Sequence, residues 1–263
     1  MDTLFLTRVL LFFFIAGSWI ALATLLTERL GSKLGGLLTN LPSNILISLI
    51  FIAFIQGTQF VKQAVPGIPI GMLIDTLFLL VFVILLKYSL LLSIIGSLLI
   101  WFVLAILAAF IEYDQLIPNI IFYLLVTITS FIILERVFKI PSQSKSSKKY
   151  SWKQILLRAI FAGGVVASVV FISRIFNPFA VGVFSTFPAV LLSTMVILAI
   201  NQSREFAQAT GKVLVISSTN IVVYSLGVYW SYPRYGIILG TIMSFILAVI
   251  WVWSFRPFVH KIS

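Results

Sequence analysis

Residues 36–60 read GLLTNLPSNILISLIFIAFIQGTQF, and the stretch returns 146 positions later, without a gap, as residues 182–206, GVFSTFPAVLLSTMVILAINQSREF. Matches of Leu or Ile carry little weight in so apolar a chain, but glycine, proline, glutamine and phenylalanine also recur at fixed spacing. The matched pairs are Gly36 and Gly182, Pro42 and Pro188, Ala53 and Ala199, Gln56 and Gln202, and Phe60 and Phe206. The register also holds upstream, where Gly17 meets Gly163. The sequence therefore predicts an internal duplication.

The composition indicates an integral membrane protein. Of 263 residues, 61% are hydrophobic and 10% charged, and the apolar runs are longer than a soluble core uses. The chain has no Cys and a single His, His260, which excludes disulfides, Cys-ligated metals and most His-based chemistry. The net charge of +11 is interpreted loop by loop against a membrane, and no nucleic acid partner is expected.

Nine segments are apolar and long enough to cross a bilayer, for which about 20 residues are needed. They are residues 4–26, 34–56, 66–86, 89–111, 116–134, 155–176, 180–201, 213–230 and 235–255. The tryptophans, Trp101 among them, are predicted mostly to lie near span ends as an aromatic belt.

The connector KIPSQSKSSKKYSWK, residues 139–153, is the most basic loop and is expected in the cytoplasm. Alternation from there places fourteen basic residues inside and four outside. This predicts a multi-pass cell-membrane protein with its N-terminus outside and its C-terminus cytoplasmic. The loop could also hold anionic lipid headgroups at about 1 kcal/mol per lysine, although a plain topology signal is the alternative. The lysines concerned are Lys145, Lys148, Lys149 and Lys153.

The duplication predicts a particular architecture. Spans one to four recur as spans six to nine, and the fifth span has no counterpart. Because five spans, an odd number, precede the second unit, that unit enters the membrane upside down. The expected fold is an all-α membrane protein of about nine helices, with two inverted four-helix repeats joined by a central fifth helix. The first repeat covers residues 1–113, the linker helix and basic loop 114–153, and the second repeat 154–263.

Pro42 and Pro188 each lie about eight residues into a predicted span, roughly 12 Å deep, near the bilayer centre. An interior proline frees a carbonyl that something else must satisfy in lipid. Because the two helices enter from opposite sides, their kinks can meet and form a midplane binding site. The polar candidates around the kinks are Thr39, Asn40, Asn44, Ser185 and Thr186. The alternative is a packing joint in which the hydroxyl groups only bond back to carbonyls.

Asp75 is the acidic residue at mid-span, where a carboxylate costs on the order of 2.5 to 3.5 kcal/mol on insertion scales. Such residues usually face a cavity, a partner or a proton path. The register pairs Asp75 with Ile221, beside Asn220 and shortly after Ser217. This predicts an asymmetric site, with a carboxylate on one side and neutral polar groups on the other. A role in packing alone is the alternative.

Signals of an enzyme are weak. The sequence offers no His-Asp-Ser set, no acidic cluster for a divalent metal and no glycine-rich phosphate loop. We therefore expect no catalytic residue, metal or cofactor.

Each four-span unit resembles the small four-span prokaryotic membrane proteins of the GlpM-like group and related uncharacterised families. The likeness rests on the pattern G-x-x-[ST]-x-[LF]-P at the start of a helix and on a basic residue, Tyr and a small residue at the start of the last span. The residues that carry it are Gly36, Thr39, Leu41 and Pro42 with Lys87, Tyr88 and Ser89, and Gly182, Ser185, Phe187 and Pro188 with Arg234, Tyr235 and Gly236. The resemblance implies a fused pair of four-helix units and names no substrate.

The sequence thus predicts a secondary transporter or translocator of a small molecule or lipid-like substrate, with its site where the repeats meet. Its expected partners are the lipid bilayer and a small-molecule or ion substrate. A non-transporting membrane scaffold or assembly subunit, and a passive channel, are the alternatives.

Overall fold

The computed structural model describes residues 3–29, 42–141 and 151–262, and all the regular structure in these ranges is helical. The helices before the central one are α1 (Thr3–Arg29), α3 (Ser43–Gln56), α4 (Thr58–Ala64), α5 (Gly67–Leu85) and α6 (Leu90–Ile111). The central helix α7 (Leu116–Ile132) continues into a short π-helical turn, η1 (Ile133–Val137). The remaining helices are α8 (Trp152–Ile172), α9 (Pro178–Phe184), α10 (Ala189–Asn201), α11 (Arg204–Ser217) and α12 (Thr219–Ile262).

Seven helical stretches of the described residues are long and apolar enough to cross a membrane. One of them, Arg204–Ser254, contains two of the predicted spans and is interrupted at Gly236, where φ is 74°. A further predicted span is represented by the shorter apolar helix Ser43–Gln56. The structure thus supports a multi-pass helical membrane protein, and the count of nine spans stays a prediction.

Local sequence signals define several of the helix ends. The Ser151 side chain accepts a hydrogen bond from the backbone N–H of Gln154, whose own side chain accepts from the backbone N–H of Ser151, which forms a capping box at α8. At α9, the Asn177 side chain accepts a hydrogen bond from the backbone N–H of Ala180. Pro178 occupies the first turn of this helix, where its missing N–H costs nothing. Ordinary capping interactions therefore define where α8 and α9 begin.

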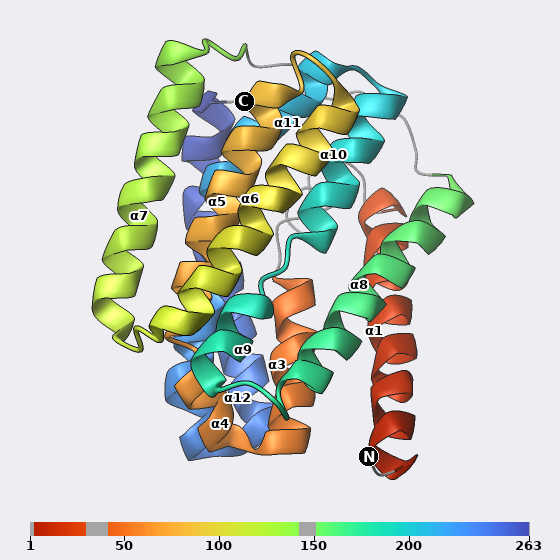
Figure 1. The fold of residues 1–263 in the computed structure, drawn as a ribbon, viewed down its shortest axis with the longest axis vertical. Coiled ribbons are helices and arrows are strands. Elements are labelled where there is room, and N and C mark those ends of the chain that lie inside the picture. The colour runs from red at the N-terminus through yellow and green to blue at the C-terminus, as the bar shows by residue number, and fades with distance from the viewer. Residues whose placement is uncertain (1–2, 30–41, 142–150, 263) are drawn as a thin grey trace.

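The long helices run roughly along the longest axis of the molecule, and the start of α1 and the end of α12 lie at opposite ends of it (Figure 1). Helix α1 packs against α8 at one side, and α7 lies at the other side against α5. The short helices α4 and α9 lie side by side near one end, and α10 and α11 near the other. Large apolar side chains on the outer faces of α1, α6 and α7 are exposed, as expected for surfaces that face lipid.

Helix breaks recur at the spacing of the predicted duplication. The starts of α3 and α10, at Ser43 and Ala189, are 146 positions apart, and so are the starts of α4 and α11, at Thr58 and Arg204. Each of the first pair follows a proline of nearly the same conformation. Pro42 has φ −77° and ψ 50°, and Pro188 has φ −79° and ψ 41°. Over the described residues, helices thus start at matching places in both halves of the chain.

Candidate functional site

Asp75 lies in the middle of α5 and is 2% exposed. Its carboxylate accepts a hydrogen bond from the indole N–H of Trp101 on α6, with 2.7 Å between Oδ1 and Nε1. Trp101 is fully buried in the middle of α6, so its prediction as an interfacial residue is wrong. The position of Trp101 near the centre of the predicted span 89–111 was the available signal, because an interfacial tryptophan usually lies near the end of a span.

Trp101 connects Asp75 to the break between α9 and α10. Its ring packs edge-to-face on Phe187, with 4.8 Å between ring centroids, and more distantly on Phe184, at 6.0 Å. Phe187 immediately precedes Pro188, and Phe184 is the last residue of α9. The acid of the first half of the chain is therefore linked through one indole ring to the broken helix of the second half.

The same face of α5 is held close to α9 by two glycines. Gly67 and Gly71 lie two turns and one turn before Asp75 on this helix. A β-carbon on Gly67 would collide with the carbonyl oxygen of Phe179, and one on Gly71 would collide with the Thr186 hydroxyl. Small residues thus allow the broken helix to cover the face of α5 that carries the acid.

Both prolines are buried, and Pro188 immediately precedes α10, at the end of a non-helical link that starts at Ser185. The hydroxyl groups at this break bond back to their own chain. Ser185 donates to the carbonyl of Gly182 at 2.7 Å, and Thr186 donates to that of Val183 at 2.8 Å. The prolines were expected to kink continuous helices, but each precedes a helix start because proline cannot continue the hydrogen-bond ladder.

The predicted polar partners in the second half do not bond to Asp75. Ser217 is partly exposed at the end of α11, and Asn220 is 1% exposed in the first turn of α12. Within the described ranges, the Asn220 amide nitrogen and the Asn44 amide oxygen are buried without a hydrogen-bond partner. Thr39 and Asn40 lie outside the described residues.

The later part of the chain follows a spacing of 147 residues, which matches Ser89 at the start of α6 with the break at Gly236. At this spacing Trp101 pairs with Ala248, and in the register of the predicted duplication Asp75 pairs with Ile221. Ile221 is partly buried and Ala248 is fully buried. At the positions predicted to match the hydrogen-bonded acid and indole, the second half of the chain has two apolar side chains.

The central helix α7 contributes side chains that the sequence analysis did not single out. Tyr123 is fully buried in α7, a helix that packs against α5, and over the described residues its hydroxyl group has no hydrogen-bond partner. Thr127 lies 3.4 Å from the hydroxyl of Thr76, which is the residue after Asp75. The available signal in the sequence was the helical spacing of Asn119, Tyr123, Thr127 and Ser130, which places them on one face of the span.

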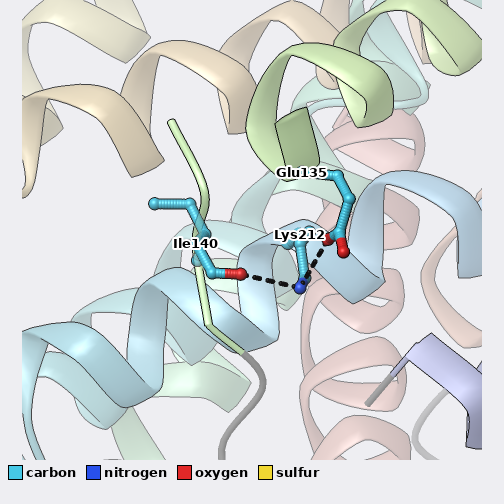
Figure 2. A network of polar contacts seen from close by, with 3 residues as sticks. All are labelled: Glu135, Ile140 and Lys212. Carbon is cyan, nitrogen blue, oxygen red and sulfur yellow. Dashed lines mark hydrogen bonds and ion pairs between the residues drawn. The ribbon is translucent and has the colours of Figure 1, made fainter. Parts of the chain in front are cut away.

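A second polar contact joins the end of α7 to α11. Lys212 is 1% exposed and donates to the carboxylate of Glu135 and to the carbonyl of Ile140, both at 2.8 Å (Figure 2). Glu135 lies in η1 and is 46% exposed, so this pair joins the interior to the surface. Lys212 is one of the fourteen basic residues predicted to lie on the cytoplasmic side.

The predicted headgroup lysines Lys145, Lys148 and Lys149 lie outside the described residues, and Lys153 is exposed in the first turn of α8. Over the described ranges, no three His, Asp or Glu side chains gather as a metal site would require.

Comparison with known proteins gives one match. Residues 9–113 match the model of a family described as a protein of unknown function, DUF3147. The match spans α1 to α6 and so includes Asp75 and Trp101. It carries no link to the GlpM-like group or to a duplication, so both stay predictions. No curated protein and no solved structure matches the chain. The N-terminal part of this chain is similar to that family.

Proposed function

We propose that this protein is a secondary transporter of a small molecule or lipid-like solute, built from two inverted four-helix repeats on either side of α7. Its site lies at mid-membrane, where α5 meets the break between α9 and α10. The observation that carries the proposal is the buried acid beside a broken helix, joined by Trp101 from Asp75 to Phe187. Transporters of this plan bind their substrates at discontinuous helices near the midplane.

The α1–α8 contact supports the inverted repeat. Gly17 and Gly163 are equivalent in the predicted duplication, and a β-carbon on Gly163 would lie 3.4 Å from the backbone nitrogen of Gly17. Equivalent residues that touch each other lie close to the two-fold axis that relates their units. The family match also supports a unit of this size, because it ends at residue 113, where the first predicted repeat ends.

The proposed orientation has the N-terminus outside and the C-terminus in the cytoplasm. It rests on the excess of Lys and Arg in alternate loops. In this orientation the exposed residues Lys87 and Lys153 lie on the cytoplasmic side and Arg174 and Arg234 on the outer side.

A cysteine placed at the break tests whether the site opens to water. The chain has no native Cys, so Thr186→Cys gives a single label site in vesicles of either orientation. A membrane-impermeant maleimide is expected to react from both sides, in a ratio that Asp75→Asn changes. Exposed Lys87→Cys serves as the reactive control, and Thr129→Cys, on the lipid-facing side of α7, as the unreactive one.

A membrane scaffold or assembly subunit is the second candidate. The observation that favours it is the bonding of Ser185 and Thr186 back to carbonyls of α9, which leaves their hydroxyl groups engaged within the chain. If the maleimide reacts with Thr186→Cys from neither side, the scaffold is the correct function. Equal reaction from both sides that is insensitive to Asp75→Asn would indicate a passive channel instead.

A further inference from the structure

A largely apolar groove of about 490 Å³ lies beside the interruption of α12 at Gly236. Its walls are Phe54 of α3 and four residues of α12: Tyr235, Ile237, Ile238 and Leu239. The backbone at Gly236 has φ 74° and ψ −174°, a conformation that glycine alone adopts readily. The glycine therefore fixes where the chain turns and which side chains form the groove.

Arg234 is joined to the wall of this groove through Trp230. The Arg234 guanidinium lies 4.8 Å from the centroid of the Trp230 ring, and the centroid of the Tyr235 ring lies 5.6 Å from the same point. Arg234 also donates a hydrogen bond from Nη1 to the Trp230 carbonyl at 2.9 Å, which holds the side chain in place. A cation and a wall of the groove thus contact one indole ring.

The Arg234 guanidinium is exposed and keeps most of its hydrogen-bonding capacity. An arginine side chain has five N–H donors, and the bond to Trp230 uses one of them. Lys62 of α4 adds a second positive charge, with its ammonium 5.4 Å from the centroid of the ring of Tyr229, the residue before Trp230. In the part of the chain that the structure describes, neither basic residue forms an ion pair with an acidic side chain. This end of α12 is therefore positively charged without a negative partner there.

The arrangement matches the chemistry of a phospholipid. Arginine binds phosphate oxygens through charge-assisted hydrogen bonds, and Trp and Tyr side chains favour the depth of the headgroups. An apolar groove beside them suits an acyl chain. A second groove, on α1, is lined by Phe14, Ile15, Ser18, Trp19 and Leu22 and has no basic residue in its walls. What distinguishes the groove at Gly236 is therefore the cation beside it.

We propose that the groove at Gly236 binds one anionic phospholipid, with the phosphate on Arg234 and an acyl chain against Phe54 and Leu239. The charge of Lys62 favours a headgroup of net negative charge over a zwitterionic one, because a basic residue near the membrane surface contributes about fivefold in affinity for anionic lipid, or about 1 kcal/mol. The site lies away from Asp75 and does not depend on the proposed transport function. A second copy of this chain and free phosphate are the competing occupants, which the test separates.

Quenching by brominated lipid measures occupancy at this groove. The chain has no native Cys, so Ile242→Cys carries a single fluorescent label one turn after Ile238, and Leu11→Cys carries it one turn before Ile15 in the groove of α1. Both positions are exposed. In phosphatidylcholine nanodiscs, phosphatidylglycerol with brominated acyl chains is expected to quench the label at Ile242→Cys at an about fivefold lower lipid fraction than the label at Leu11→Cys. Brominated phosphatidylcholine is expected to quench both labels alike.

Matched arginine variants test the headgroup contact. Arg234→Gln, added to the labelled Ile242→Cys protein, is expected to remove the preference for phosphatidylglycerol. Arg174→Gln is the control, because Arg174 is also exposed and its guanidinium also lies over a ring, that of Phe5, at 3.7 Å from the centroid, but it lines no groove. Its quenching curve is expected to match that of the labelled parent.

Four results would overturn the site. Equal quenching of the two labels by brominated phosphatidylglycerol, or an unchanged curve in Arg234→Gln, would show that Arg234 selects no lipid. If neither brominated lipid quenches the label at Ile242→Cys while both quench that at Leu11→Cys, a second copy of the chain covers the groove. If inorganic phosphate at constant ionic strength abolishes the preference, the guanidinium binds phosphate alone. The maleimide experiment on Thr186→Cys tests the transport proposal separately.

Discussion

Gly163 of α8 lies directly against the backbone of Phe13 in α1. A β-carbon on Gly163 would be 2.6 Å from the Phe13 carbonyl oxygen, whereas one on the neighbouring Gly164 would meet no atom within 4 Å. The two adjacent glycines thus differ in environment while sharing the same helix. Since α1 makes its main contact with α8, this crossing fastens the first helix to the molecule.

Gly163→Ala is therefore expected to destabilise the protein relative to Gly164→Ala. Both changes gain helix propensity of about 1 kcal/mol, but only the first forces the two backbones apart, at a cost of about 1 to 3 kcal/mol. The measurement is thermal unfolding of the two variants in the same detergent. Equal midpoints would mean that the α1–α8 crossing adjusts freely.

Trp101→Phe is expected to lower stability by about 1 to 3 kcal/mol, because it leaves the buried carboxylate of Asp75 without its indole donor. Trp253→Phe is the matched control, since Trp253 is 67% exposed. Adding Asp75→Leu to Trp101→Phe removes both partners and is expected to recover part of the loss. Denaturant titrations of the wild type, Trp101→Phe, Asp75→Leu and the double variant give the interaction energy of Trp101 with Asp75, and strict additivity would argue against a coupled pair.

Lys212→Met is expected to loosen the segment from η1 to Ile140. The ion pair itself contributes at most about 1 kcal/mol, because Glu135 is half-exposed. The larger effect comes from the Ile140 carbonyl, which loses its buried donor. Hydrogen exchange over residues 133–140 is expected to accelerate by about 10- to 100-fold, consistent with a local loss of about 1 to 3 kcal/mol.

Exposed Lys87→Met provides the control for Lys212→Met, since it removes a lysine without a buried contact. Its exchange rates over residues 133–140 are expected to match those of the wild type. Unchanged exchange in Lys212→Met would show that other contacts hold this segment.

The proposed orientation predicts the labelling of single cysteines at helix ends. Lys87→Cys and Lys153→Cys are expected to react with an impermeant maleimide only in inside-out vesicles, and Arg174→Cys and Arg234→Cys only in right-side-out vesicles. All four positions are exposed, so reactivity depends on sidedness rather than burial. Lys153 and Arg174 reacting from the same side would contradict the predicted passage of α8 across the membrane.

The sequence predicted the helical membrane class, backbone irregularities at Pro42 and Pro188, and an acid at mid-span, although it predicted kinks where the structure has helix starts. These follow from hydropathy, proline geometry and the cost of a charge in lipid, which are local properties of the chain. The hydrogen-bond partner of Asp75 could not be predicted in this way. It depends on how α5 and α6 rotate against each other, and a tryptophan is an ordinary residue in any membrane helix.

The polar face of α7 was visible in the sequence but was not recognised. Tyr123 and Thr127 are single polar residues in a strongly apolar segment, and their common orientation becomes apparent only when the periodicity of that span is counted. The burial of Lys212 was not predictable, because a basic residue near a span end usually faces water. Its burial depends on the contact with η1.

The unequal halves of the molecule limit the energetics of the proposed carrier. In the predicted duplication Ile221 and Ala248 stand where Asp75 and Trp101 would recur, so a proton-coupled cycle that used Asp75 would move at most one proton. A membrane voltage of 100 mV would then contribute about 2.3 kcal/mol per turnover, enough to concentrate a neutral solute about fiftyfold. Each unit of pH difference multiplies that ratio by about ten. In the proposed carrier, one unmatched side chain would therefore set the steepest gradient that coupling to Asp75 could sustain.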